Sequence, residues 1–114
     1  AMTINDYSQQ ALRTLLGEHA YGEVDAKLMA QVLGLGGESG EVLEKFKKIL
    51  RDKQGRISGS DRTAIVKELG DVLWYVNAIA HLVGSDLEEV ARLNNEKLAS
   101  RQYRGQLQGS GDDR

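Results

Sequence analysis

Four acidic side chains fall into two pairs of equal spacing, Glu38 with Glu41 and Glu68 with Asp71. Residues three apart on an α-helix are neighbours on its surface, so each pair projects from one edge of its helix. Each pair also lies beside apolar residues that are expected to face a core. Four carboxylates on the inner edges of two packed helices would form an acidic cleft. Such a cleft must take up protons, find counter-charges or bind hard divalent cations.

A single pair of this kind usually belongs to a solvated helix face or to a network of ion pairs. Three features favour a metal site here. Both pairs lie at the edge of an apolar stripe, each spans a glycine (Gly40 and Gly70) that would let backbones approach closely, and one loop joins the two helices, which we expect to be antiparallel neighbours. Carboxylates without His or Cys suit Mg²⁺, Mn²⁺ or Ca²⁺ rather than Zn²⁺. We therefore predict a Mg²⁺ site.

Apolar residues recur at helical spacing in four stretches. These predict helices over residues 3–16, 25–51, from 60 or 61 to 83, and from 85 onward, the last opened by a capping box at Ser85–Glu88. The second stretch contains Gly34, Gly36, Gly37 and Gly40, and each would cost about 1 kcal/mol relative to Ala in a helix. The apolar stripe keeps its phase across them, which favours a continuous helix closely approached by another group.

Composition indicates a single helical domain over residues 1–104 and a Gly-rich tail over residues 105–114. A net charge of −2 provides no basic field for nucleic acid. The absence of Cys excludes disulfides and thiolate metal sites, and no apolar run is long enough to span a membrane. No signal peptide is visible, so a cytoplasmic location is the default expectation.

We also expect the tail, residues 105–114, to fold over a site, with Asp112 or Arg114 near phosphate or metal.

Mg²⁺ held by a few carboxylates commonly binds substrate phosphates, which also require cations and hydrogen-bond donors. Suitable side chains follow the first acidic pair and recur on one face of the last helix: Lys45, Lys48, Asn94, Lys97 and Arg101. Each of these alone is an ordinary surface residue. Trp74 and Tyr75, just after the second pair, could contact a base or belong to the core.

The two acidic motifs and their flanks, "GESGEVLEKFKK", "KELGDVLWYV" and "LNNEKLASR", resemble the blocks of the MazG-like nucleoside triphosphate pyrophosphohydrolases. The tail "GSGDDR" is similar to an ending seen in a branch of that family. The resemblance implies an all-α, four-to-five-helix bundle of the MazG/type II dUTPase kind that forms a homo-oligomer, a dimer or tetramer. It implies hydrolysis of a nucleoside triphosphate (NTP or dNTP) to the monophosphate and pyrophosphate with Mg²⁺, for which Mn²⁺ could substitute. The metal ligands that it implies are Glu38, Glu41, Glu68 and Asp71, and the phosphate contacts are Lys45 or Lys48, Asn94, Lys97 and Arg101.

One departure from the family pattern concerns the group that activates water. Many relatives have a Glu immediately before the first motif Glu, whereas this chain has Gly37. The catalytic role then falls to Glu38 or Glu41, to the metal alone, or to another residue. Two other functions remain open from the sequence: a catalytically weak nucleotide sensor on the same fold, and a non-enzymatic helical oligomerisation module whose carboxylates pair with lysines.

Overall fold

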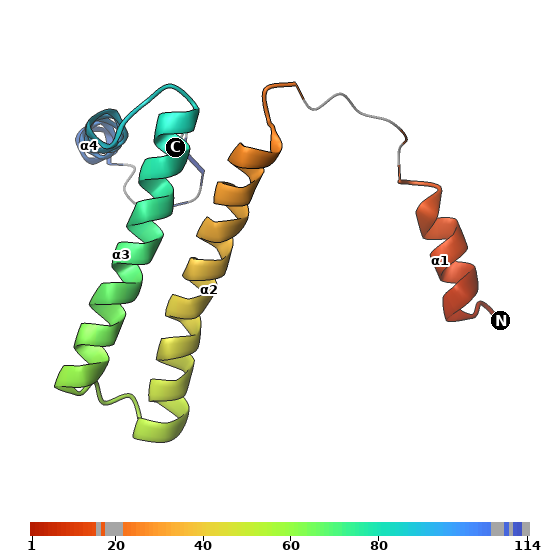
Figure 1. Ribbon diagram of the computed structural model, residues 1–114, viewed down its shortest axis with the longest axis horizontal. Coiled ribbons are helices and arrows are strands. Elements are labelled where there is room, and N and C mark those ends of the chain that lie inside the picture. The colour runs from red at the N-terminus through yellow and green to blue at the C-terminus, as the bar shows by residue number, and fades with distance from the viewer. Residues whose placement is uncertain (16, 18–21, 106–108, 110, 113–114) are drawn as a thin grey trace.

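The chain folds into helices and connecting loops in a computed structural model that describes residues 1–15, 17, 22–105, 109, 111 and 112. Over these residues it contains no strand, which confirms the all-α prediction. Figure 1 shows the helices in chain order, which are α1 (Ile4–Leu12), α2 (Ala26–Lys53), α3 (Gly59–Leu82) and α4 (Leu87–Arg104).

The centre of the fold is an antiparallel hairpin of the two long helices, α2 and α3 (Figure 1). Helix α2 runs without interruption through its glycines, as predicted. It ends where Gln54 and Gly55 take left-handed φ values of 54° and 80°, and the Gly55 amide donates to the Ile49 carbonyl. Lys53 pairs with Asp61 at 2.8 Å and so ties the end of α2 to the start of α3. These contacts fix the acidic stretches of the two helices side by side.

The helix starts differ from the sequence predictions because the capping residues differ. Helix α3 begins at Gly59, earlier than predicted, because Ser58 and Asp61 form a reciprocal capping box. The N-cap of α4 is Asp86, whose carboxylate accepts from the Glu89 amide at 2.8 Å, so the predicted box at Ser85–Glu88 is wrong. The Ser85 amide is instead bonded to the Ala80 carbonyl and belongs to the end of α3.

Helix α1 is shorter than the predicted 3–16. It ends at Leu12 because the Thr14 hydroxyl bonds to the Ala11 carbonyl at 2.7 Å, and the amides that follow make tighter turns. Leu16 lies outside the described residues. The N-terminal cap is Thr3, which forms a capping box with Asp6.

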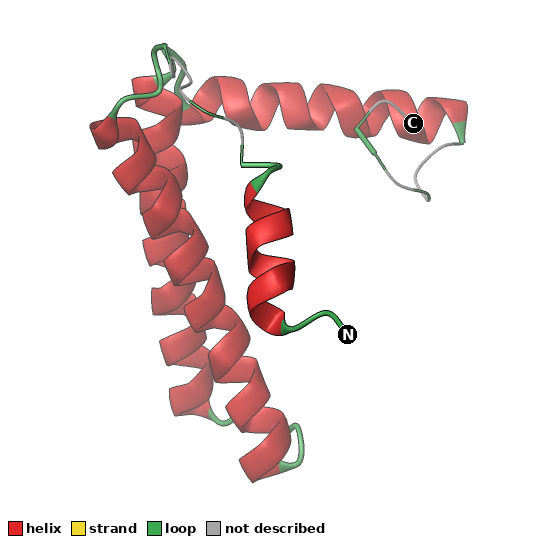
Figure 2. Ribbon diagram, turned by 90° about the vertical axis from the view of Figure 1, so that its right-hand side faces the viewer, coloured by secondary structure: helices red, strands yellow, loops and turns green. Residues whose placement is uncertain are grey.

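The protomer is open rather than closely packed. Helix α4 packs only against α3, and α1 contacts none of the other helices in the described part of the chain (Figures 1 and 2). The radius of gyration is 20.2 Å, whereas a compact domain of this length would have about 13 Å. Ile49 and Ala80 are the only buried apolar residues among those described. No described helix combines the length and the apolar character that a membrane crossing requires.

Close approach at the glycines of α2 occurs at one position. The ring of Tyr75 from α3 lies directly against Gly34, where any Cβ would overlap it. A Cβ at Gly36, Gly37 or Gly40 would meet nothing within 4 Å, and the same holds for Gly70 on α3. The predicted close approach therefore holds at Gly34, and the two glycines inside the acidic motifs do not provide it within the protomer.

Substituting two of these glycines with alanine should change stability in opposite directions. Gly36→Ala should raise the free energy of unfolding by about 1 kcal/mol, because alanine favours the helix and its methyl group enters open space. Gly34→Ala should lower it, because the displacement of the Tyr75 ring costs about 1–3 kcal/mol and outweighs the same gain. Urea denaturation of the two variants measures both effects. Equal stabilisation by both would show that Tyr75 does not rest on Gly34 in solution.

Candidate metal centre

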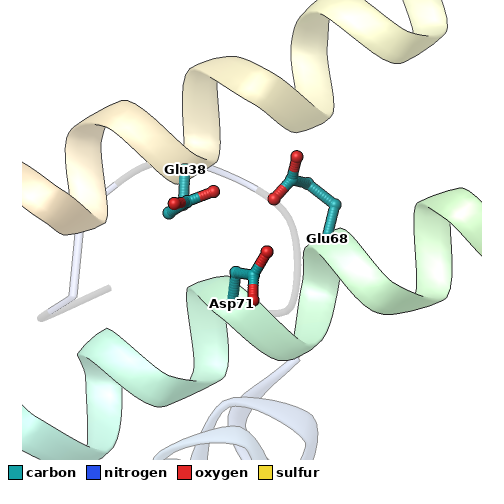
Figure 3. A group of neighbouring side chains, drawn as sticks. All are labelled: Glu38, Glu68 and Asp71. Carbon is teal, nitrogen blue, oxygen red and sulfur yellow. The ribbon is translucent and has the colours of Figure 1, made fainter.

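Three of the four predicted carboxylates converge between the long helices. Glu38 projects from α2, and Glu68 and Asp71 project from α3 toward it (Figure 3). Each offers one oxygen atom, and these oxygens all lie within 4.8 Å of one another. The hairpin produces this arrangement, because it places the middle of α2 opposite the middle of α3. We refer to Glu38, Glu68 and Asp71 as the acidic cluster.

Glu41 does not belong to this cluster. It lies on α2 one turn after Glu38, and its side chain is exposed. The spacing of three residues places both glutamates on the same flank of α2, but only Glu38 faces α3 closely enough to join the group. Glu44, one further turn along, forms an ion pair with Lys47 at 2.9 Å.

The cluster carries more negative charge than its surroundings balance. Glu68 is buried, with 9% of its surface exposed. The hydrogen bond that its protonated form shares with Glu38, its burial and the neighbouring Asp71 together raise the pKa of Glu68 from 4.5 to about 7. Lys45 offsets part of this effect, with its Nζ atom 3.8 Å from a Glu68 oxygen. Among the described residues, one ion pair, that of Lys45 with Glu68, offsets the charge of the three carboxylates, so the cluster suits a proton or a cation.

The donor set fits a hard divalent cation. Carboxylate oxygens are the ligands that Mg²⁺ and Mn²⁺ prefer, and the described residues bring no His near the cluster. Of the two histidines, His81 is exposed on the last turn of α3, and His19 lies outside the described residues. Glu38, Glu68 and Asp71 could hold a metal that leaves other coordination positions open to water and phosphate.

A hollow of about 320 Å³ adjoins the cluster and is lined by Glu38, Asp71, Trp74 and Tyr75. The two aromatic rings meet edge to face, with centroids 5.0 Å apart and planes at 81°. Tyr75 is half-buried against Gly34, whereas 60% of the Trp74 surface is exposed. The sequence left Trp74 and Tyr75 equivalent, whereas in the structure Tyr75 packs against Gly34 of α2 and Trp74 is largely exposed.

The predicted phosphate contacts fall into two groups. Lys45 lies at the cluster, and Lys48 lines a groove with Lys45 and Lys53 toward the hairpin turn. Asn94 and Lys97 instead line a groove between α3 and α4, and Arg101 lies in the last turn of α4. Among the described residues, Lys97 and Arg101 form ion pairs with Asp112 of the C-terminal tail rather than with the acidic cluster. Arg101 is buried, with only 4% of its surface exposed, and no sequence pattern predicted this burial.

Comparison with known proteins agrees with this geometry. Residues 27–104 match the family model of the MazG nucleotide pyrophosphohydrolase domain. The chain is also 50% identical over 82 residues to the Gene 37 protein of Mycobacterium phage L5, a match that covers 72% of each chain. No solved structure matches the chain. The matched region contains the whole acidic cluster, and on this evidence the chain belongs to the MazG nucleotide pyrophosphohydrolase family.

Proposed function

We propose that the protein hydrolyses nucleoside triphosphates, NTP or dNTP, to the monophosphate and pyrophosphate in a Mg²⁺-dependent reaction, with Mn²⁺ as a substitute. The observation that carries the proposal is the convergence of Glu38, Glu68 and Asp71 from two helices within a MazG domain. We further propose that the enzyme acts on the cytoplasmic nucleotide pool. The acidic cluster would hold the metal through its carboxylate oxygens.

When bound, a divalent cation neutralises phosphate charge and lowers the pKa of a bound water toward neutrality. Lys45 stands at the edge of the cluster, where its ammonium group can donate to phosphate oxygens and replace its contact with Glu68. We assign the removal of the proton from water to the carboxylates of the first motif, Glu38 or Glu41. Glu41 suits this role because it is exposed and is not engaged in the cluster. Trp74 is largely exposed and lines the hollow beside the cluster, so its ring can stack on the nucleobase.

We propose that the active form is a homo-oligomer, a dimer or tetramer. The large radius of gyration and the exposed apolar side chains on all four helices support this assembly. They include Leu12 on α1, Leu43 on α2, Leu73 on α3 and Leu93 on α4, each more than half exposed. A second copy would cover these faces and could bring Asn94, Lys97 and Arg101 toward a neighbour's acidic cluster. Sedimentation equilibrium should give a mass above 12.5 kDa, and a purely monomeric protein would refute the assembly.

The proposed activity is tested with a panel of ribo- and deoxyribonucleoside triphosphates, each incubated with the purified chain and Mg²⁺. At least one should yield the monophosphate and pyrophosphate, and the ranking across the panel identifies the preferred base and sugar.

Gly37 favours a second candidate function, a weakly catalytic nucleotide sensor. At this position, immediately before Glu38, many relatives have a carboxylate that this chain lacks. A sensor would bind a nucleotide of the panel in the presence of Mg²⁺ without turning it over.

A further inference from the structure

The C-terminal tail turns back onto the helix from which it comes. Gly105 ends α4 with a φ of 70°, and Gly109 and Gly111 have φ values of 118° and 85°. Such backbone angles favour glycine, so the sequence itself provides for the reversal. Asp112 thereby reaches side chains 11 and 15 residues earlier in the chain.

Arg101 is buried by this return. Its neighbours on the last turns of α4 are exposed, whereas 4% of its own surface is accessible. Its Nη2 group donates to the carbonyl oxygens of Gly111 and Asp112. Its Nε–H group is buried and has no hydrogen-bond partner among the described residues. A buried donor left without a partner costs about 1–3 kcal/mol, so Arg101 retains capacity for one further acceptor.

The carboxylate of Asp112 completes the contact. One of its oxygens lies 2.9 Å from the Nζ atom of Lys97 and 3.6 Å from the Nη2 atom of Arg101. The hydrogen bond with Lys97, together with the positive charges of Lys97 and Arg101, lowers the pKa of Asp112 and keeps it ionised. The carboxylate is 84% exposed, so water can replace it at little cost. Lys97 and Arg101, one helical turn apart, thus bind the Asp112 carboxylate only weakly.

The family resemblance already implies phosphate contacts at Lys97 and Arg101. We propose that the tail occupies this pair of cations through Asp112, and that phosphoryl oxyanions compete with Asp112 for it. Asp112 then acts as an internal competitor for these two cations until a phosphate group displaces it. The spare Nε–H of Arg101 gives a multidentate phosphoryl group a donor that the Asp112 carboxylate leaves unused. The inference rests on the proposed function only in taking phosphate-bearing molecules as the natural ligands.

The test measures binding of inorganic pyrophosphate to the full chain by calorimetry without divalent metal. Asp112→Asn removes the competing charge and should tighten binding about two- to fivefold, the range expected for an exposed ion pair. Asp113→Asn changes the net charge equally at the next position and is the matched control, which should bind like the wild type. The double variant Lys97→Met/Asp112→Asn should lose the gain, because half of the site is removed.

Weaker or unchanged binding by Asp112→Asn would overturn the inference, as would an equal gain with Asp113→Asn or a gain that survives the loss of Lys97. The assay involves neither metal nor turnover, so its outcome is independent of the proposed activity. An inactive protein with the expected binding pattern would refute the proposed function and leave the inference standing. An active enzyme without that binding pattern would support the proposed function and refute the inference.

Discussion

Asp71→Asn is expected to reduce pyrophosphate release by more than about a hundredfold, the loss typical when a charge-stabilising group is removed from an active site. Asp71 provides one of the three oxygens that converge within 4.8 Å. An amide has no negative charge and holds a hard cation poorly, so both metal affinity and turnover should fall. Glu68→Gln should behave in the same way. Rates of pyrophosphate release at saturating nucleotide, measured over a range of Mg²⁺ concentrations, test both variants.

Two further variants on α2 make this experiment specific. Glu44→Gln removes a carboxylate that pairs with Lys47 outside the cluster, and it should leave the rate within about twofold of the wild type. Glu41→Gln should lower the maximal rate without changing the Mg²⁺ concentration at half-maximal rate, if Glu41 accepts the proton from water. A loss of metal affinity in Glu41→Gln would instead make it a fourth ligand. A rate for Asp71→Asn within a few-fold of wild type would exclude the acidic cluster as the catalytic centre.

The second large effect concerns metal and pH together. The pKa of Glu68 is raised from 4.5 to about 7 in the metal-free protein, so between these values the folded chain binds more protons than the unfolded chain. Stability of the metal-free protein should therefore fall as pH rises from about 4.5 to about 7. Mg²⁺ replaces the proton on the same carboxylates, so it should raise the melting temperature more at pH 8 than at pH 5.5.

At a Mg²⁺ concentration a hundred times the dissociation constant, the gain in the free energy of unfolding would be about 2.7 kcal/mol. Scanning calorimetry with Mg²⁺ or with EDTA at both pH values measures this effect. Glu68→Gln should reduce both the pH dependence and the response to Mg²⁺, and Glu44→Gln should reduce neither. If Mg²⁺ had the same effect on Glu68→Gln as on the wild type, the cation would be binding elsewhere on the surface.

Local sequence patterns predicted the long helices well, because apolar periodicity and caps are properties of neighbouring residues. The errors lie at helix ends, where two residues compete for one role. Ser85 could cap α4 or complete the end of α3. The hydrogen bond from its backbone amide to the Ala80 carbonyl places it at the end of α3. Thr14 carries a hydroxyl group that competes with the backbone at the end of α1. Such competition is settled by the geometry of the connection rather than by residue type.

The candidate site was predictable in its chemistry but not in its membership. Spacing places Glu38 and Glu41 on one flank of α2, but the packing of α2 against α3 decides that only Glu38 reaches the cluster. Likewise, spacing groups Asn94, Lys97 and Arg101 on one face of α4 without fixing where that face lies. In the structure Asn94 and Lys97 line a groove between α3 and α4, and Lys97 and Arg101 pair with Asp112 rather than with the acidic cluster. The reversal of the tail depends on three glycines at positive φ, which composition alone makes equally typical of a flexible terminus.

The most direct test of the central claim identifies the products of one preferred nucleotide from the panel. The purified chain is incubated with that triphosphate, with or without Mg²⁺, and free phosphate is measured before and after inorganic pyrophosphatase is added. The account predicts no phosphate without the metal. With Mg²⁺ it predicts phosphate only after the pyrophosphatase treatment, together with one nucleoside monophosphate for each pyrophosphate. Phosphate release that needs no pyrophosphatase and leaves a diphosphate, or no turnover of any triphosphate with Mg²⁺ or Mn²⁺, would contradict it.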